Sequence, residues 1–413
     1  MDVLYERCCG VDVHKKVVVA CLITPDAAGT PTKQTRTYGT MTGGLLELMD
    51  WLVDAGCTHV AMESIGVFWK PLYNLMEGAL EILVVNAAHM AHMKNVPGRK
   101  TDVKDAEWIA DLLRLGLLQA SFIPDRPQRE LRELTRYRTS LLQERSAEVN
   151  RLQKTLEGAN IKLSSVATDI MGKSGRDMLA ALVAGRTDAA ALAQLARGKL
   201  REKLPQLEKA LRGQFADHQR FLVAQQLAHI DGLDEIIDRV SAEIAERVRP
   251  FEEAIAQVDT VTGIGRRTTE VLVAEVGTDL TRFRTHRHLA SWAGLCPGNN
   301  ESAKHKGGKT RKGSPWLRAA LIEAAKAAGR SKKTYLGAQY RRIAARHGAK
   351  RAAVAVAHSL LVIVYHILTR HEPYHDLGVA YFDERDRQAV ERRLVKRLQA
   401  LGYDVSLRPL TAA

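Results

Sequence analysis

The N-terminal part of the chain alternates short β-rich runs with helical patterns, and this order restricts the folds that it can adopt. Residues 8–13 and 17–24 are β-rich and are separated by three polar residues, as in a hairpin, and a third strand is expected around 35–38. Apolar strands and helices then alternate, with helices expected at 45–53 and 69–77 and strands at 59–63 and 82–86. The sequence therefore predicts an α/β domain in which three antiparallel strands precede β-α-β units.

Two acidic residues end otherwise apolar strands of this domain. Asp12 ends the first strand and Glu63 ends the fourth. The strand order is the one expected of an RNase H-like fold, in which these two strands are neighbours, so both side chains would converge at one edge of the sheet. Asp102 and Asp105 are three residues apart at a predicted helix start and share a helix face. Four carboxylates gathered in this way repel one another unless a cation compensates them, and hard oxygen ligands suit Mg²⁺ or Mn²⁺.

Each of these carboxylates also has an ordinary structural interpretation. Asp102 fits an N-cap, Asp105 a first-turn partner of the helix dipole, and Glu63 one half of an ion pair. An acidic residue at the end of an apolar strand is harder to explain in this way, because a buried charge needs a partner.

Long helical patterns follow the α/β domain. Apolar residues recur at roughly helical spacing from 128 to about 156, and a second helical run covers roughly 207 to 247. Two such helices predict an antiparallel coiled coil or a dimer arm. An ordinary helical linker domain is the alternative, because the apolar repeat is irregular.

A unit rich in glycine and basic residues begins after Pro250. Gly263 and Gly265 form a Gly-x-Gly turn before a predicted helix, which is typical of a helix-hairpin-helix element whose backbone N–H groups approach a phosphate. An ordinary turn is the alternative. Further on, a run of cations with few acidic residues predicts contact with a sugar-phosphate backbone rather than a merely solvated surface. Its members are Lys304, Lys306, Lys309, Arg311, Lys312 and Arg318.

The charge of the whole chain agrees with a polyanionic partner. Lysine and arginine number 61 against 47 acidic residues, a formal net charge of +14, which favours nucleic acid. The five cysteines form no Cys-x-x-Cys pair, so neither a zinc site nor a disulfide framework is expected, and a cytoplasmic location fits. The charged N-terminus predicts no signal peptide. The apolar stretch 352–368 contains two histidines and is expected to be a buried core helix, so no membrane association is predicted.

Taken in order, these segments resemble a known family. The matching text lies at residues 10–15, 63–72, 84–86 and 100–106, and residues 262–317 resemble a second block of the same family nearly throughout. The family is that of the insertion-sequence transposases with an N-terminal RuvC-like domain carrying a DEDD carboxylate set, which are RNA-guided recombinases. The chain departs from the family pattern at Ala87, where proline is usual, and at Ala303, where glycine is common. The resemblance implies that the metal ligands are Asp12, Glu63, Asp102 and Asp105.

The resemblance also implies a nucleophilic serine. In the family, the serine after a Gly-Leu-x-Pro segment attacks DNA and becomes linked to a 5′ phosphate, and position for position it is Ser302. From the residues alone, a serine in a basic loop is usually a surface hydroxyl. Ser291 falls in an apolar helical segment, and Ser314 fits the N-cap of the next helix. The resemblance implies that the metal site and this serine form a composite active site.

The sequence is therefore interpreted as an α/β plus α protein in four parts. These are an RNase H/RuvC-like DEDD domain (1–125), a helical coiled-coil or linker region (126–250), a mainly α transposase domain with a helix-hairpin-helix element and the serine (251–371), and a helical tail (372–413). The resemblance implies a recombinase that excises and inserts a mobile element. It would act on donor and target DNA as a homo-oligomer, a dimer or a tetramer, with a structured noncoding guide RNA. The alternatives are a RuvC-like hydrolytic junction resolvase or nuclease and a non-catalytic nucleic-acid-binding protein.

Overall fold

A computed structural model describes residues 3–64, 66–86, 101–298, 301–302, 305–306 and 310–407, with the backbone alone at 301–302 and 305–306. The chain divides into two compact units, residues 1–124 and 125–413. The division falls where the predicted α/β pattern ends and the long helical pattern begins. The first unit is mixed α/β, and the second is almost entirely helical.

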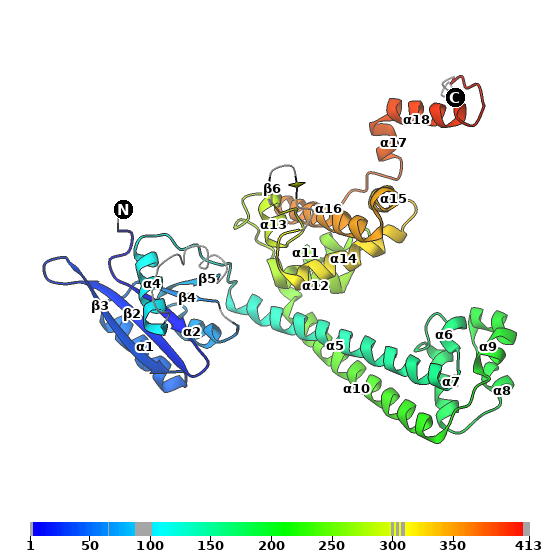
Figure 1. The fold of residues 1–413 in the computed structure, drawn as a ribbon, viewed down its shortest axis with the longest axis horizontal. Helices are drawn as coiled ribbons and strands as arrows, with labels where there is room; N and C mark the ends of the chain where they lie inside the picture. Colours follow the sequence, from blue (N-terminus) through cyan, green and yellow to red (C-terminus); the bar gives the residue numbers. More distant parts are fainter. Residues whose placement is uncertain are drawn as a thin grey trace. The chain divides into compact units, whose positions relative to one another are not determined.

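The first unit is built on a five-stranded mixed sheet (Figure 1). Its strands are β1 Cys8–Val13, β2 Val17–Pro25, β3 Pro31–Gly39, β4 His59–Glu63 and β5 Glu81–Val85. The order is β3-β2-β1-β4-β5, with β1 to β3 antiparallel and β1, β4 and β5 parallel. The predicted meander followed by β-α-β units is confirmed. β3 is longer than the strand expected around residues 35–38. Its side chains are polar and mostly exposed, so no apolar pattern in the sequence indicated its full length.

Helices cover both faces of this sheet. α1 Thr42–Asp54 and α2 Trp69–Met76 pack on the face to which Val11 points. α4 Asp102–Arg114 packs on the opposite face, against Ala61. Side chains alternate between the faces of a strand, so the even-numbered residues of β1 lie toward α4.

Gly10 allows α4 to lie directly on β1. A Cβ atom at this position would lie 2.2 Å from the backbone nitrogen of Ala110 and 2.3 Å from the carbonyl oxygen of Ala106. Both are backbone atoms of α4, so neither can swing aside as the end of a flexible side chain can. Only glycine permits this approach of helix to strand.

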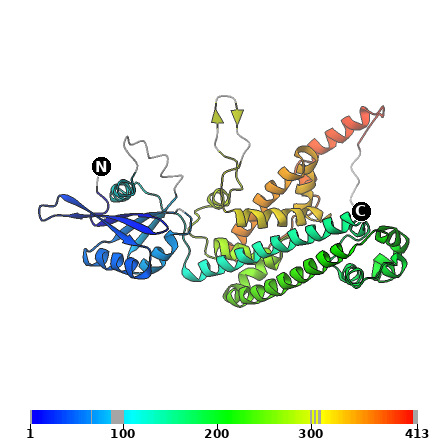
Figure 2. The same cartoon turned by 60° about the horizontal axis from the view of Figure 1, so that its bottom comes forward.

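Two long helices, α5 Arg126–Gly158 and α10 Asp217–Arg247, lie side by side in the second unit (Figures 1 and 2). Three apolar clusters along the pair contain residues of both helices: Leu131 with Ile244, Leu141 with Ile237, and Leu152 with Val223. Since low residue numbers of one helix meet high numbers of the other, the pair is antiparallel.

The prediction of one helical run over 207–247 was wrong. α9 Leu204–Leu211 ends before a turn, and α10 begins only at Asp217. Within the turn, a Cβ atom on Gly213 would lie 2.3 Å from the carbonyl oxygen of Ala159, just after α5. The chain bends here because it packs closely against the end of α5.

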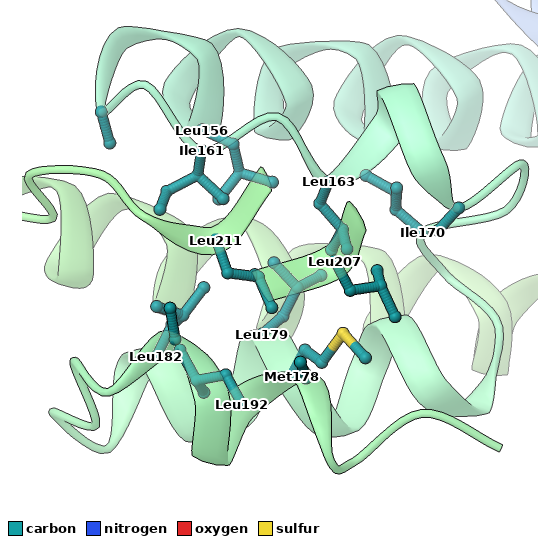
Figure 3. Packing of buried hydrophobic residues seen from close by; sticks show 14 of the residues in the cluster. Leu156, Ile161, Leu163, Ile170, Met178, Leu179, Leu182, Leu192, Leu207 and Leu211 are labelled. Atoms are coloured by element: carbon teal, nitrogen blue, oxygen red, sulfur yellow. The ribbon is translucent and has the colours of Figure 1, made fainter. Parts of the chain in front are cut away.

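Short helices close the far end of the long pair around an apolar core (Figure 3). These helices are α6 Leu163–Val166, α7 Lys173–Val183, α8 Ala189–Ala193, the 3₁₀ helix η1 Gly198–Lys203, and α9. Leu179 and Leu207 belong to this core together with Leu156 of α5. The short helices are thereby anchored to the long pair.

The rest of the second unit is a helical lobe. Its elements are the 3₁₀ helix η2 Arg249–Phe251, α11 Glu252–Asp259, α12 Arg266–Val276, α13 His286–Trp292, β6 Glu301–Ser302, β7 His305–Lys306, α14 Pro315–Arg330, α15 Tyr335–His347, α16 Ala349–Arg370, α17 Tyr381–Arg385 and α18 Arg387–Gln399. By length and composition α16 could cross a membrane, but the core helix of a globular domain passes the same test. It packs against α11, α13, α14 and α15, as expected for a core helix.

Two carboxylates of α12 are buried against α5. Glu275 is fully buried and accepts hydrogen bonds from Nε and Nη2 of Arg136, at 2.7 and 2.9 Å. Glu270 lies 2.7 Å from Nη1 of Arg138, and both of these side chains are almost completely buried. Removing one partner of a buried ion pair costs about 3–5 kcal/mol, because the other charge is left uncompensated. These pairs fasten α12 to the long helix.

Replacing Gly10 with alanine is expected to destabilise the first unit by about 1–3 kcal/mol or more, as overpacking of a rigid contact does. Hydrogen exchange of the α4 amides in the full chain measures the loss. Gly43→Ala is the matched control, because a Cβ atom at this exposed position of α1 meets no atom within 4 Å. Equal exchange rates for the two variants would show that α4 can move away from β1 without cost.

Candidate active site

Two of the predicted ligands lie at one edge of the sheet in the first unit. The last paired residues of β1 and β4 are Val11 and Met62, so Asp12 and Glu63 come next on neighbouring parallel strands. Ala61 packs toward α4, and alternation places Glu63 on that same face, together with Asp12. Asp12 is only 4% exposed, and Glu63 is half-buried.

The other two predicted ligands lie in the first turn of α4. Asp102 and Asp105 are both there, as the sequence spacing predicted. The N-cap, however, is Thr101, whose hydroxyl accepts a hydrogen bond from the backbone nitrogen of Lys104 at 3.3 Å. The interpretation of Asp102 as the N-cap was therefore wrong, because Thr101 has that role.

His14 joins Asp12 to Asp102. Its Nε2 lies 3.1 Å from Oδ2 of Asp12 and 3.5 Å from Oδ1 of Asp102. One ligand atom from each of these three residues lies within 4.8 Å of the other two, an arrangement that could hold a metal ion. Glu63 and Asp105 lie outside this tight group. The sequence pattern did not single out His14, which lies directly after β1 and two residues beyond Asp12.

The environment of Asp12 opposes its ionisation. Burial raises the pKa of this carboxyl, His14 lowers it through charge and a hydrogen bond, and the nearby Asp105 and Asp102 raise it further. A divalent cation would compensate all of these negative charges at once. Carboxylate oxygens suit Mg²⁺ or Mn²⁺, and an imidazole is more typical of transition metals. The chemistry of the site therefore suggests a divalent metal without identifying it.

The predicted serine lies on a short hairpin of the second unit. β6 and β7 pair through Glu301 with Lys306 and through Ser302 with His305. A bridge between Pro297 and Thr310 closes the base of this hairpin. Two of the predicted phosphate contacts, Lys304 and Lys309, lie outside the described residues.

Two arginines of the predicted basic strip hold the base of this hairpin. Nη1 of Arg318 donates hydrogen bonds to the carbonyl oxygen of Gly294 and, at 2.7 Å, to Oγ1 of Thr310. Nη1 of Arg311 donates to Oγ of Ser291 at 3.1 Å. Lys312 between them is exposed. These contacts give Arg318 and Arg311 structural roles that their position in a run of cations did not indicate.

The two glycines of the predicted helix-hairpin-helix turn differ in their surroundings. Gly263 has a φ of +92°, and a Cβ atom on it would lie 2.5 Å from the carbonyl oxygen of Ala324 in α14. Gly265 is exposed and is the N-cap of α12. The first glycine is thus required for packing between helices, and the second leaves the start of α12 open to solvent.

Ser314 caps α14, as the sequence predicted. Its Oγ accepts from the backbone nitrogen of Leu317 at 3.3 Å and donates to Oε2 of the buried Glu275 at 3.1 Å. Ser291 lies in α13, the predicted helical segment. The hydroxyls of both Ser291 and Ser314 therefore form hydrogen bonds within the fold.

Comparison with known proteins finds transposase families that match both units of the chain. A family model described as Transposase, named for the DEDD motif and IS110, matches residues 9–161, and one described as Transposase IS116/IS110/IS902 family matches residues 255–341. The chain is 30% identical over 146 residues to the transposase for insertion sequence element IS1111A of Coxiella burnetii, covering 34% of this chain and 40% of the relative. It is 31% identical over 260 residues to the insertion element IS116 uncharacterized 44.8 kDa protein of Streptomyces clavuligerus, covering 55% and 63%.

A third relative extends the similarity over more of the chain. It is a probable family 20 transposase of Pseudomonas aeruginosa, 25% identical over 284 residues, which are 68% of this chain and 75% of the relative. The chain spans less than two thirds of the length of the first two relatives. The two family models fall on the two parts that carry the carboxylates and the hairpin. The chain belongs to the insertion-sequence transposases with an N-terminal DEDD domain.

Proposed function

We propose that this chain is a DNA transposase that excises and inserts a mobile element through metal-dependent strand cleavage with a covalent 5′-phosphoserine intermediate. The observation that carries the proposal is the cluster formed by the buried Asp12 at the carboxyl end of β1, Asp102 in the first turn of α4, and His14. Family membership supplies the substrate class, which is DNA.

The metal site would be formed by Asp12, Glu63, Asp102 and Asp105, with Mg²⁺ or Mn²⁺ as the ion. Asp12 and Asp102 already lie together, and the half-buried Glu63 and the first-turn Asp105 are on the same side of the sheet. Bound divalent ions polarise a phosphodiester and stabilise its leaving oxygen. The carboxylates would hold the metal ions in fixed positions, because they lie on two strands and a helix of the folded unit.

Ser302 would supply the nucleophile. Its hydroxyl oxygen would bond to phosphorus as its proton is removed, the bond from phosphorus to the 3′ oxygen would break, and the 3′ end would leave as a hydroxyl. Attack by a new 3′ hydroxyl on the phosphoserine would restore the serine and rejoin DNA. A covalent intermediate of this kind divides one difficult substitution into two easier steps.

The remaining parts of the proposal rest on the family resemblance. They are a structured noncoding guide RNA, a homo-oligomer that is a dimer or a tetramer, a composite active site made by the carboxylates and Ser302, and a division of the second unit at about residues 250 and 371. The net charge of +14 supports the binding of donor and target DNA and of RNA.

A hydrolytic nuclease is the second candidate, because the cluster of Asp12, His14 and Asp102 is complete within the first unit. In that case a water molecule replaces the serine as nucleophile, and no protein becomes linked to DNA.

Changing Asp12 or Asp105 to asparagine is expected to abolish strand cleavage, because the change removes a ligand charge with little change of volume. Cleavage in Mg²⁺ on denaturing gels and Mn²⁺ binding by electron paramagnetic resonance measure the effect. Asp111→Asn is the matched control on α4, where Asp111 pairs with Lys33 at 2.7 Å on the surface. Near wild-type cleavage by both variants would refute the metal-site assignment.

Replacing Lys304, Lys306, Lys309 and Lys312 together with alanine is expected to weaken binding to every DNA sequence to a similar degree. The slope of log affinity against log salt should fall by about 0.9 for each lost contact with duplex phosphate. Fluorescence anisotropy at several salt concentrations measures it. An unchanged slope would mean that this loop does not contact DNA.

Ser302→Ala is expected to remove both the DNA-linked protein and recombination, because alanine has no hydroxyl to form the phosphoserine. The adduct is measured on denaturing gels with labelled DNA. The Ser291→Ala and Ser314→Ala proteins are the controls and should retain the adduct. Nicking by Ser302→Ala without an adduct would favour the hydrolytic nuclease, and normal recombination would mean that another serine attacks.

A further inference from the structure

A cleft of about 650 Å³ opens beside the base of the β6–β7 hairpin. α14 contributes Arg318 to its lining, α15 contributes Gln339, and the segments that enter and leave the hairpin contribute Pro297 and Thr310. One face of α16 completes it. Small-molecule sites in proteins have volumes of about 300–1,000 Å³, so the cleft is large enough for a ligand. It is formed by residues of the second unit, whereas the carboxylates belong to the first unit.

The lining of this cleft is positively charged. Arg318, Lys350 and Arg351 contribute three cationic side chains, and none of the described residues that line the cleft is acidic. Arg318 uses only Nη1 for its hydrogen bonds to Gly294 and Thr310, and a guanidinium has three further N–H groups. The charge favours an anionic ligand, and an arginine fork fits the oxygens of a phosphate or a carboxylate.

The start of α16 strengthens the preference for an anion. Lys350 and Arg351 lie in its first turn, where no residue is acidic, and the N-cap, Gly348, offers no side-chain hydrogen bond. Helix N-termini carry partial positive charge, so cations there are unfavourable by about 0.3–1 kcal/mol each. A bound phosphate would reverse this repulsion and would also accept from the free N–H groups of the first turn.

The same face of α16 then provides apolar and polar groups. Val354, Ala355 and His358 follow Arg351 by three, four and seven residues, so all four share a face. Burial and the neighbouring His286 lower the pKa of His358, which favours the neutral imidazole with one donor and one acceptor. Val354 and Ala355 can contact the face of a flat heterocycle, and His358 can form a hydrogen bond with its edge.

Gln339 lines the cleft and has an unsatisfied amide oxygen. Its Nε2 donates to Oγ of Ser359 at 2.9 Å, while its Oε1 is buried and has no hydrogen-bond partner among the described residues. An unmade hydrogen bond of this kind costs about 1–3 kcal/mol. If the amide turned toward the cleft, the amino group of a nucleobase would provide the missing donor.

We propose that this cleft binds one unpaired nucleotide of the DNA substrate, with the phosphate at the start of α16 and the base against Val354 and Ala355. The proposal rests on the proposed transposase function and names a part of its substrate. Pro297 lines the cleft, and Ser302 follows it by five residues, which span at most about 18 Å when extended. A nucleotide held in the cleft would therefore pin the strand close to the phosphate that Ser302 attacks.

The test uses the full chain and a short single-stranded DNA that carries 2-aminopurine, a base that becomes brighter when it leaves the stack. The wild-type protein is expected to brighten it on binding. Lys350→Ala with Arg351→Ala should weaken binding about tenfold and reduce the salt slope by about 0.7 for each lost single-strand phosphate contact. Lys199→Ala with Arg201→Ala is the charge-matched control, since both residues are exposed on η1 and neither lines the cleft.

A second variant tests recognition of the base. Gln339→Leu should reduce affinity about tenfold, as expected for loss of one buried hydrogen bond, and should reduce the brightening while keeping the salt slope. Gln143→Leu, at an exposed position of α5, is its control.

Three results would overturn the proposal. They are equal affinities for the two double variants, full brightening with Gln339→Leu, and brightening by RNA but not by DNA of the same sequence. None of these measurements needs strand cleavage. A wild-type protein that binds and brightens the DNA but forms no serine adduct would therefore count against the proposed function alone.

Discussion

The contact between Gly10 and the backbone of α4 determines where the acidic groups of the first unit can lie. Asp12 follows Gly10 by two residues on β1, and Asp102 precedes the contacting Ala106 by about one helical turn. One steric contact between two backbones therefore sets the distance between a strand carboxylate and a helix carboxylate. Because the distance does not depend on the rotamer of a packed side chain, the site is held on rigid elements, as a metal centre requires.

The charge balance at this edge of the sheet explains why it is suited to bind and release a cation. Asp12 is almost fully buried and cannot move into water, whereas the side chain of His14 is 44% exposed. The imidazole of His14 can therefore move away from Asp12 without opening a cavity. The buried carboxylate of Asp12 then needs another cation beside it. An ion that binds only the folded unit also stabilises it, by mass action.

The sequence predicted the parts of the site that depend on local pattern. Strand alternation and the three-residue spacing in α4 placed Asp12, Glu63, Asp102 and Asp105 on their elements. Contacts between distant segments lie outside the reach of such patterns. The run of cations predicted that Arg318 contacts a sugar-phosphate backbone, but it did not indicate that Arg318 also donates to Gly294 and Thr310. The break after α9 depends on the packing of Gly213 beside Ala159. The apolar periodicity of residues 207–247 carries no information about this contact with a distant residue.

The buried Glu275 has a mechanical consequence for the second unit. It is bonded both to Arg136 of α5 and to Ser314, which caps the helix that carries Arg318. The hairpin base is thus linked to α5 by a series of short, directional bonds in addition to the apolar contacts between α12 and α5. α5 has 33 residues and is about 50 Å long. It acts as a lever arm: a partner that tilted its far end would also turn the base of the β6–β7 hairpin, on which the predicted Ser302 lies.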